Sequence, residues 1–221
     1  MITIIDYGSG NISAIGNIYE RLNIAYKVAK IPSEIIGAEK LFLPGVGSFD
    51  ETMILLEESG FKKALDLEVI INKVPIIGIC VGMQVLGDSS EEGKLPGLGY
   101  IKGQVKRLDK SLLINKPFLP HMGWNTIKIK NQSSLFEEVD TEIGFYFLHS
   151  FYFECDNHSD LLATTEYGQS FASAINHENV YGIQFHPEKS HNNGVSLLKN
   201  FANIYCLDRE LYPVCWFIKK V

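Results

Sequence analysis

The sequence has few cysteines, no excess of positive charge and no long apolar run, and each absence excludes a class of protein. The 4 cysteines among 221 residues stand far apart and include no Cys-x-x-Cys pair, which fits neither a zinc ribbon nor a disulfide framework. The net charge is −6 at pH 7, whereas nucleic acids and anionic membranes select clustered lysine and arginine. We therefore expect no nucleic-acid partner, and a small molecule or a protein as the ligand.

Signals of export and of membrane insertion are also missing. Residues 1–6 carry no basic segment and no small-residue cleavage site, and their pattern is typical of a first core strand. No apolar run approaches the roughly 20 residues that cross a bilayer, since Leu211–Val221 is shorter and contains Pro213. These observations predict a cytoplasmic protein without membrane contact.

The first half of the chain alternates short apolar runs with helical patterns, as a parallel βαβ sheet does. The second half changes to strand-like segments separated by turn residues, which predicts antiparallel strands. The predicted fold class is α/β, a mixed and mostly parallel sheet flanked by helices, with an antiparallel extension. We expect one domain over residues 1–205 and a C-terminal tail of unknown role over residues 206–221. The predicted strands are Ile2–Tyr7, Leu41–Leu43, Pro75–Cys80, Tyr100–Leu108, Thr126–Lys130, Gly144–Glu154, Leu161–Glu166, Phe171–Asn176 and Val180–Phe185, and the predicted longer helices are Ile12–Leu22, Phe49–Leu67 and Gly194–Tyr205.

A candidate nucleophile stands at the end of the apolar strand Pro75–Cys80. Cys80 lies between Gly78 and Gly82, the pattern of a sharp strand-to-helix turn at which larger neighbouring side chains would collide. The N-terminus of the following helix would stabilise a thiolate. An ordinary buried cysteine is the alternative, because cysteine is among the most commonly buried residues.

A candidate base and its orienting group follow the strand Val180–Phe185. A cysteine nucleophile needs a base to move its proton, and the base needs a third group to hold its tautomer. His186 and Glu188 stand two residues apart in a segment that Pro187 keeps out of a helix, so both side chains would point the same way. The alternatives are a surface His–Glu pair and a metal site with His191. No further ligand is evident, and we predict no metal site.

Donors for a tetrahedral oxyanion are expected at two places. One is the backbone N–H of Val81, directly after the nucleophile. The other is the loop after the strand Leu41–Leu43, which would emerge at the same carboxyl edge of the sheet as the nucleophile. Its candidate donors are Gly45, Val46 and Gly47. The alternative is a loop that needs its glycines only for its turn.

No cofactor is predicted. The glycine-rich segment Asp6–Asn11 lacks the third glycine of a dinucleotide fingerprint, whose place Ser13 takes. No acidic residue ends the second strand, Ala25–Lys30. The residues alone thus indicate a cysteine-dependent acyl-transfer enzyme on a mixed α/β sheet, and they do not identify its substrate.

Segments spread over almost the whole chain carry a family resemblance: Ile4–Gly8 with Gly10–Asn11, Leu43–Gly47, Gly78–Gln84, Pro120–Asn125, Phe147–Ser150 and Gln184–Ser190. In this order they resemble the class I glutamine amidotransferases, and among these the glutaminase subunit of imidazole glycerol phosphate synthase, a two-protein enzyme of histidine biosynthesis. The resemblance implies that Cys80 attacks the carboxamide of glutamine, His186 protonates the departing ammonia, and water hydrolyses the glutamyl thioester while Glu188 orients the imidazole. The residues implied to hold glutamine are Gly47, Gln84, Glu92, His149 and Ser150.

The same resemblance implies a protein partner. A cyclase subunit with a (β/α)8 barrel would form a heterodimer with this chain, receive its ammonia and make imidazole glycerol phosphate and AICAR. The loop Pro44–Gly47 would be a switchable oxyanion element, poorly formed until the partner binds its own substrate. The residues implied to face the partner are Asn11, Trp124, Tyr146 and Lys189. For Trp124, a buried core aromatic is the alternative.

Other features resemble paralogues from bacterial surface-polysaccharide loci, and they imply an alternative acceptor, the amidation of sugars. These features are Ser90–Gly93, Leu95–Gly99 and His191. Two further hypotheses are a catalytically silent scaffold and a stand-alone cysteine hydrolase. The intact Cys80, His186 and Glu188 argue against the first, and hydrolysis that runs freely without a partner would favour the second.

Overall fold

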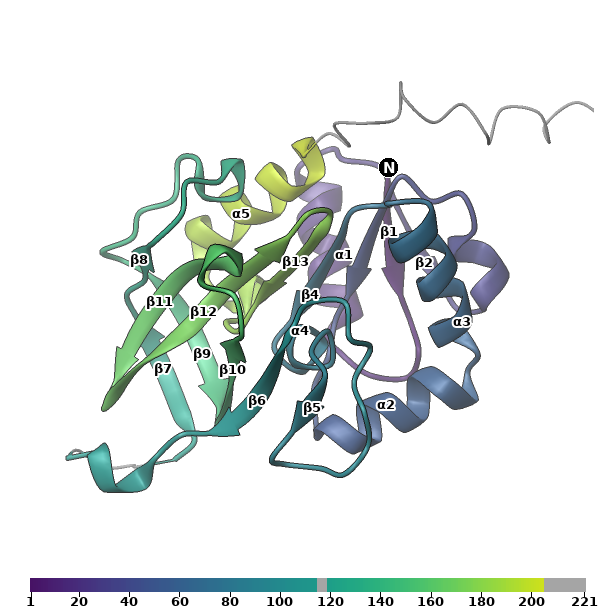
Figure 1. Cartoon of the computed structure of the whole chain (residues 1–221). Coiled ribbons are helices and arrows are strands. Elements are labelled where there is room, and N and C mark those ends of the chain that lie inside the picture. Colours follow the sequence, from purple (N-terminus) through teal and green to yellow (C-terminus); the bar gives the residue numbers. More distant parts are fainter. Residues whose placement is uncertain (115–118, 205–221) are drawn as a thin grey trace, which may run out of the picture.

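A row of parallel strands forms the first part of the main sheet. The computed structural model describes residues 1–114 and 119–204, so the expected tail over residues 206–221 lies outside them. The row has the order β2-β1-β3-β4-β13, and each neighbouring pair is parallel (Figure 1). Its strands are β1 (Ile2–Ile5), β2 (Tyr26–Ala29), β3 (Lys40–Leu43), β4 (Ile76–Ile79) and β13 (Val180–Ile183).

Beyond β13 the sheet continues in antiparallel fashion. The order is β12-β10-β6-β5, in which β5 alone is parallel to its neighbour within the described residues, and β11 joins β12 to β8. Strands β7 (His121–Asn125) and β9 (Phe145–His149) form a separate antiparallel pair. The other strands are β5 (Ser89–Ser90), β6 (Gly103–Arg107), β8 (Lys128–Ile129), β10 (Phe151–Cys155), β11 (Leu161–Tyr167) and β12 (Gln169–His177). The predicted mixed sheet with an antiparallel extension is confirmed.

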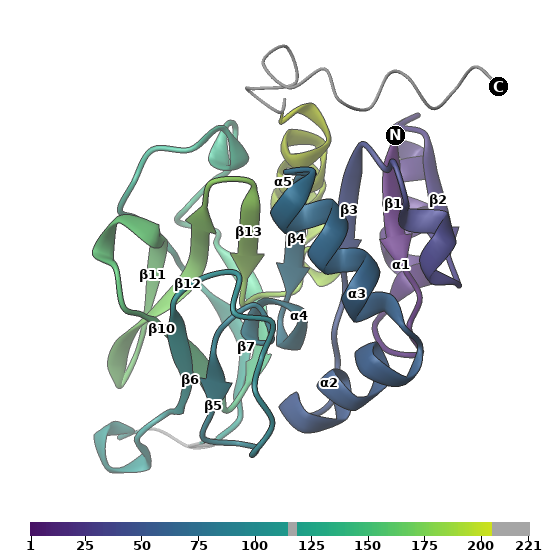
Figure 2. The same ribbon diagram turned by 45° about the vertical axis from the view of Figure 1, so that its right-hand side comes forward.

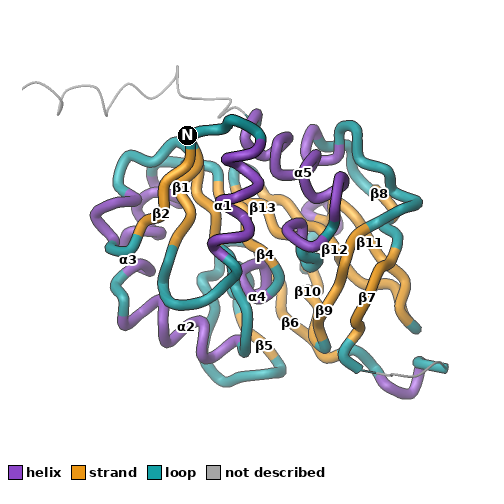
Figure 3. Tube along the Cα trace, turned by 180° about the vertical axis from the view of Figure 1, so that it is seen from behind, coloured by secondary structure: helices purple, strands orange, loops and turns teal. Residues whose placement is uncertain are grey.

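Helices cover both faces of the parallel strands. Helices α1 (Ile12–Arg21) and α5 (His191–Asn203) lie on one face (Figure 3), and α2 (Phe49–Glu58) and α3 (Phe61–Leu65) lie on the other (Figure 2). The short helix α4 (Val81–Gln84) follows β4 directly. Single turns of 3-10 helix span Pro32–Ile35, Lys110–Leu112, Ser134–Phe136, His158–Asp160 and Pro187–Lys189, and a π-helical turn spans Asp66–Ile71. Among the described residues, no helix has both the length and the apolar character that crossing a bilayer requires.

The two helical layers explain why the central strands are apolar on both faces. Every residue of β1 and of β4 is buried, as a strand between two layers of helices requires. The apolar side of α1 contributes Ile15 and Tyr19 to the core that this creates. The carboxyl ends of these strands therefore stand on a rigid base, and the residues that follow them are held in place.

Some predicted elements differ from the observed ones. The predicted helix Phe49–Leu67 is divided at Gly60, whose φ of +77° ends one helix and starts the next. The predicted strand Gly144–Glu154 is divided at Ser150 into β9 and β10, which belong to different sheets. The antiparallel prediction for Val180–Phe185 is wrong on one side, because β13 is parallel to β4 and antiparallel only to β12.

Candidate active site

Cys80 lies in the sharp turn between β4 and α4, at the carboxyl edge of the parallel strands. Its φ of +54° is unusual for a residue other than glycine and marks a strained backbone. A Cβ atom on Gly78 would lie 2.3 Å from the carbonyl oxygen of Gly82, and a Cβ atom on Gly82 would lie 2.2 Å from that of Leu43. The predicted collision at these two glycines is confirmed, and the turn that holds the buried Cys80 side chain depends on them.

His186 follows β13, the strand beside β4, and its ring meets Glu188. The Nδ1 atom of His186 lies 3.0 Å from Oε1 of Glu188, and both side chains are buried. Glu188 stands in a 3-10 turn rather than in the extended segment that the sequence predicted, because Pro187 occupies the first position of the turn, which needs no N–H. The hydroxyl of Ser190 fixes this turn by donating to the carbonyl of His186 at 2.6 Å.

The surroundings of His186 favour its charged form. Burial lowers the pKa of the imidazole, but hydrogen bonds and charges from Cys80 and Glu188 outweigh burial and raise the pKa from 6.5 to about 9. The ring thus contacts the carboxylate at Nδ1 and lies close enough to the thiol for Cys80 to influence its charge. An imidazolium beside a cysteine favours the thiolate. The three side chains meet at one point, and their catalytic roles stay predictions.

The loop Pro44–Gly47 packs closely on this turn. A Cβ atom on Gly45 would lie 2.4 Å from the backbone nitrogen of Gly82, so the loop runs directly over Val81 and Gly82. The N–H of Val46 donates to Oγ of Ser9 at 3.1 Å, and that hydroxyl donates to the carbonyl of Val46 at 2.8 Å. In this conformation the N–H of Val46 is directed to Ser9 and not to the nucleophile. Gly47 has a φ of +103°, which favours glycine.

Two residues implied to hold glutamine have buried side chains that meet at one carbonyl. Nε2 of Gln84 donates to the carbonyl oxygen of Phe151 at 3.0 Å and to Oε1 of Gln184 at 3.0 Å. Nδ1 of His149 lies 2.8 Å from the same Phe151 oxygen. The imidazole of His149 and the amide nitrogen of Gln84 are therefore occupied by contacts within the chain.

Besides Gly47 in the loop described above, the remaining implied substrate residues are Glu92 and Ser150, and both lie closer to solvent. Glu92 is exposed, and its Oε2 accepts the backbone N–H of Phe49 at 2.8 Å, at the start of α2. Ser150 is partly exposed where β9 gives way to β10, and its carbonyl accepts the N–H of Leu108 at 3.0 Å. The structure thus places Ser150 next to His149 in the chain, whereas Glu92 comes from the loop that packs on α2.

Three of the four residues implied to face a partner, Trp124, Tyr146 and Lys189, lie on one partly exposed aromatic surface. Trp124 on β7 is paired with Tyr146 on β9. Trp124 is 43% exposed and its ring stacks on His191 at a centroid distance of 5.3 Å, so the alternative of a buried core aromatic is wrong. Nζ of Lys189 lies 5.5 Å from the centroid of the Tyr146 ring. Met122, two residues before Trp124 on the same side of β7, is 56% exposed and extends this surface.

Asn11 is exposed and directly precedes α1, and its side chain forms no cap hydrogen bond with that helix. The metal alternative for His186, Glu188 and His191 receives no support, because His191 stacks on Trp124 instead. Within residues 1–114 and 119–204 no group of three or more histidine, cysteine, aspartate or glutamate residues could hold a metal ion.

Sequence reasoning assigned no role to three polar residues that contact the site. These are Ser9, His121 and Gln184. For Gln184, the sequence did contain a signal that could have identified it, a polar side chain inside an apolar segment, because it stands between Ile183 and Phe185. Both neighbours and Gln184 itself are fully buried, and a buried polar group requires a hydrogen-bond partner.

The sheet agrees with the comparisons to known proteins. Residues 3–204 match the family described as glutamine amidotransferase class-I. The solved structure of PurLQS from Thermotoga maritima superposes with a TM-score of 0.69 at 16% identity, over 91% of this chain and 97% of that chain, a likeness of fold. The chain therefore belongs to the class I glutamine amidotransferases.

Relatives at higher identity narrow the family. The imidazole glycerol phosphate synthase subunit HisH of Bdellovibrio bacteriovorus is 51% identical over 204 residues, which are 92% of this chain and 100% of that protein. The HisH subunit of Leptospira borgpetersenii is 46% identical over the same shares. Within its class, the chain belongs to the family of these HisH subunits.

Proposed function

We propose that this chain is the glutaminase subunit of an imidazole glycerol phosphate synthase in histidine biosynthesis. It hydrolyses glutamine to glutamate and ammonia through a thioester on Cys80. The observation that carries the proposal is the meeting of Cys80, His186 and Glu188 at a strained turn on the carboxyl edge of the sheet, in a chain of this family.

The geometry supports the following chemistry. The Sγ atom of Cys80 attacks the carboxamide carbon, and the imidazolium of His186 gives its proton to the departing nitrogen, so that ammonia leaves. The neutral ring then takes a proton from water, whose oxygen attacks the thioester carbon and releases glutamate and the thiol. Glu188 holds the Nδ1 side of the ring throughout. Backbone N–H groups of Val81 and of Gly45, Val46 or Gly47 would stabilise the oxyanion.

Glutamine would lie between the nucleophile and the four residues Gln84, Glu92, His149 and Ser150. Both ring nitrogens of His149 already have hydrogen-bond partners within the chain. His149 would therefore contribute to substrate binding through its backbone and by shaping the pocket. The exposed carboxylate of Glu92 suits the positively charged amino group of the substrate.

The partner would be a cyclase subunit with a (β/α)8 barrel, bound as a heterodimer at the surface that carries Asn11, Trp124, Tyr146 and Lys189. The exposed Trp124 ring suits an interface anchor. The Ser9 contact with Val46 supports a resting state in which one oxyanion donor is withheld until the partner acts. The unit that does this would be one cytoplasmic domain over residues 1–205, with a tail over residues 206–221.

The relatives reported above carry the name of imidazole glycerol phosphate synthase, which favours this acceptor over the amidation of surface sugars. The test is to measure glutamine hydrolysis by the chain alone and after addition of a cyclase barrel subunit with its ribonucleotide substrate. We expect an increase of about a hundredfold or more, the contribution of one restored oxyanion donor. An unchanged rate would count against this partner.

Cys80→Ala separates the nucleophile from the partner in the same assay. The variant should lose glutamine hydrolysis, because no thioester can form, while its complex with the cyclase still uses added ammonia for synthesis. Hydrolysis that survives the substitution would remove Cys80 from the proposed role.

A further inference from the structure

A single carbonyl group fixes the hydrogen-bond direction of a buried network around the nucleophile. The carbonyl oxygen of Phe151 is approached by Nε2 of Gln84 at 3.0 Å and by Nδ1 of His149 at 2.8 Å. A carbonyl oxygen accepts hydrogen bonds and cannot donate them. Both approaching atoms must therefore carry hydrogen, and this sets the direction of every bond beyond them.

The first branch leads to Cys80. Since the NH2 group of Gln84 faces Phe151, its second hydrogen meets the Gln184 side chain at 3.0 Å, and the atom there must be the acceptor, Oε1. The remaining end of the Gln184 amide is then Nε2, which lies 3.7 Å from Sγ of Cys80. The amide of Gln184 thus offers the sulfur an N–H donor, and not an oxygen.

The second branch leads away from the nucleophile to β7. With Nδ1 of His149 protonated, its neutral ring accepts at Nε2, where Nδ1 of His121 lies 3.0 Å away. His121 in turn accepts at Nε2 from the amide of Asn125 at 3.2 Å. Burial keeps both rings neutral, because it lowers the pKa of His121 to about 4 and that of His149 to about 3.

The surroundings of the sulfur make this donor important. The backbone carbonyl of Leu148 also lies near Sγ, at 3.9 Å. It is an acceptor that suits the thiol and opposes the thiolate. Gln184 is fully buried, and a hydrogen bond to a charged group is worth more than one between neutral groups. A neutral donor on a rigid strand end would stabilise the thiolate without competing for the proton of His186.

We propose that Gln184 is a positioning residue that donates an N–H to the Cys80 thiolate, with its orientation set by the Phe151 carbonyl through Gln84. The inference rests on the proposed function only in taking Cys80 as the reacting group. Because both hydrogens of the Gln84 amide are used in this network, Gln84 has only its Oε1 atom to offer glutamine, and it would accept a hydrogen bond from the substrate.

The experiment measures the rate at which iodoacetamide alkylates Cys80 in the full chain from pH 5 to pH 10, resolved from the other cysteines by mass spectrometry of the digest. Gln184→Met keeps the length of the side chain and removes the donor. We expect the midpoint of the profile to rise by about one pH unit, which slows alkylation about tenfold on the acidic side, while the plateau at high pH is unchanged. Gln184→Glu, which replaces the donor by an acceptor in the same shape, should move the midpoint further.

The matched control is Gln132→Glu, the same change at an exposed glutamine, and it should leave the profile where it is. Thermal unfolding of each variant checks that the fold is intact. If methionine at position 184 disturbs the packing, the alkylation profile of Gln184→Glu provides the test in its place. A lower plateau with an unmoved midpoint in both Gln184 variants would overturn the inference, because Gln184 would then only fill space. A native midpoint as high as that of Cys155, whose pKa burial raises to about 12, would overturn both this inference and the activated nucleophile of the proposed function.

Discussion

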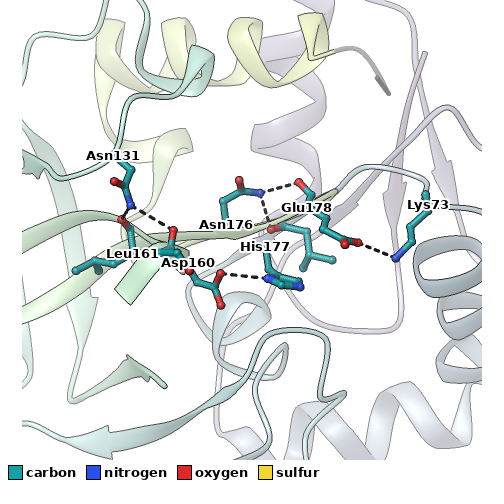
Figure 4. Close-up of polar contacts among 9 residues, drawn as sticks. Lys73, Asn131, Asp160, Leu161, Asn176, His177 and Glu178 are labelled. Atoms are coloured by element: carbon teal, nitrogen blue, oxygen red, sulfur yellow. Dashed lines mark hydrogen bonds and ion pairs between the residues drawn. The ribbon is translucent and has the colours of Figure 1, made fainter. Parts of the chain in front are cut away.

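The two ends of one pair of parallel strands, β4 and β13, hold charged groups in opposite ways. At the amino ends, Lys73 and Glu178 form an ion pair of 2.8 Å between side chains that are 51% and 58% exposed (Figure 4). The neighbouring Asn176 binds the chain itself, because its amide donates to the carbonyls of Glu178 and Val180 at 2.9 and 3.0 Å. These contacts close the turn between β12 and β13.

At the carboxyl ends of the same strands, the charged groups are enclosed. Cys80, His186 and Glu188 are almost fully buried, and Nδ1 of His186 lies 3.0 Å from Oε1 of Glu188. A charge in water is screened and contributes little, whereas a buried charge is costly unless it is paired and hydrogen-bonded. The difference indicates that contacts at the amino ends fix the register of β4 and β13. The same register places the reactive groups beside each other at the carboxyl ends.

The largest effect on stability and on the reactivity of Cys80 is expected from adding a side chain at Gly78, at the carboxyl end of β4. Gly78→Ala would place a Cβ atom 2.3 Å from the carbonyl oxygen of Gly82, and the turn would have to shift. We expect the free energy of unfolding to fall by about 3 kcal/mol, together with loss of the reactive thiol. Urea denaturation measures the first effect and alkylation of Cys80 the second.

The control for that change lies at the amino side of the sheet. Gly37 precedes β3, has a φ of +71° and would give a Cβ atom nothing within 4 Å. Gly37→Ala should therefore cost only the backbone strain, about 1 kcal/mol. Equal losses in the two variants would show that close packing does not distinguish the two ends.

An intermediate effect is expected from acid, and it depends on the buried histidines. Burial lowers the pKa of His121 to about 4 and of His149 to about 3, below the 6.5 of an unfolded chain. As the pH falls below 6.5 the unfolded chain binds protons that the folded chain refuses, so stability decreases toward pH 4. At pH 5 each ring lowers the free energy of unfolding by about 2 kcal/mol relative to neutral pH, since one pKa unit corresponds to about 1.4 kcal/mol.

Urea denaturation at pH 7 and at pH 5 tests this slope. The two buried rings together lower the free energy of unfolding between pH 7 and pH 5. His121→Asn should remove about half of that decrease, whatever the stability of the variant at pH 7. His158→Asn, at an exposed position, is the control and should leave the slope unchanged. An acid slope that is the same with and without His121 would contradict a neutral ring inside the network.

Local pattern predicted the parts of the fold that depend on local physics. The apolar run Ile76–Ile79 is a fully buried strand, because burial on both faces leaves no room for polar residues. Strand β7 was not predicted, since Pro120 directly precedes it and Gly123 within it has a φ of +125°, and both residues weaken a strand pattern. The division at Ser150 depends on which sheet each half joins, and a sequence does not show this without its partners.

The same limit applies to the site. The strand-to-helix turn and the spacing of His186 and Glu188 indicated three groups that the fold does bring together. The substrate and partner roles came from the family resemblance and not from spacing. Gln184 gained a role only from distances to Gln84 and Cys80, residues about a hundred positions away. Contacts between distant strands decide hydrogen-bond direction, and no local pattern encodes them.

The smallest effect is expected at the amino ends. Glu178→Gln removes the charge that pairs with Lys73. Because both side chains are more than half exposed, water and salt screen the pair, and the free energy of unfolding should change by less than about 1 kcal/mol at 0.1 M salt. The alkylation profile of Cys80 should not move, since the pair lies at the opposite end of β4. A change in that profile would mean that the charged turn and the nucleophile are coupled along the strands, and the division between the two ends would then be wrong.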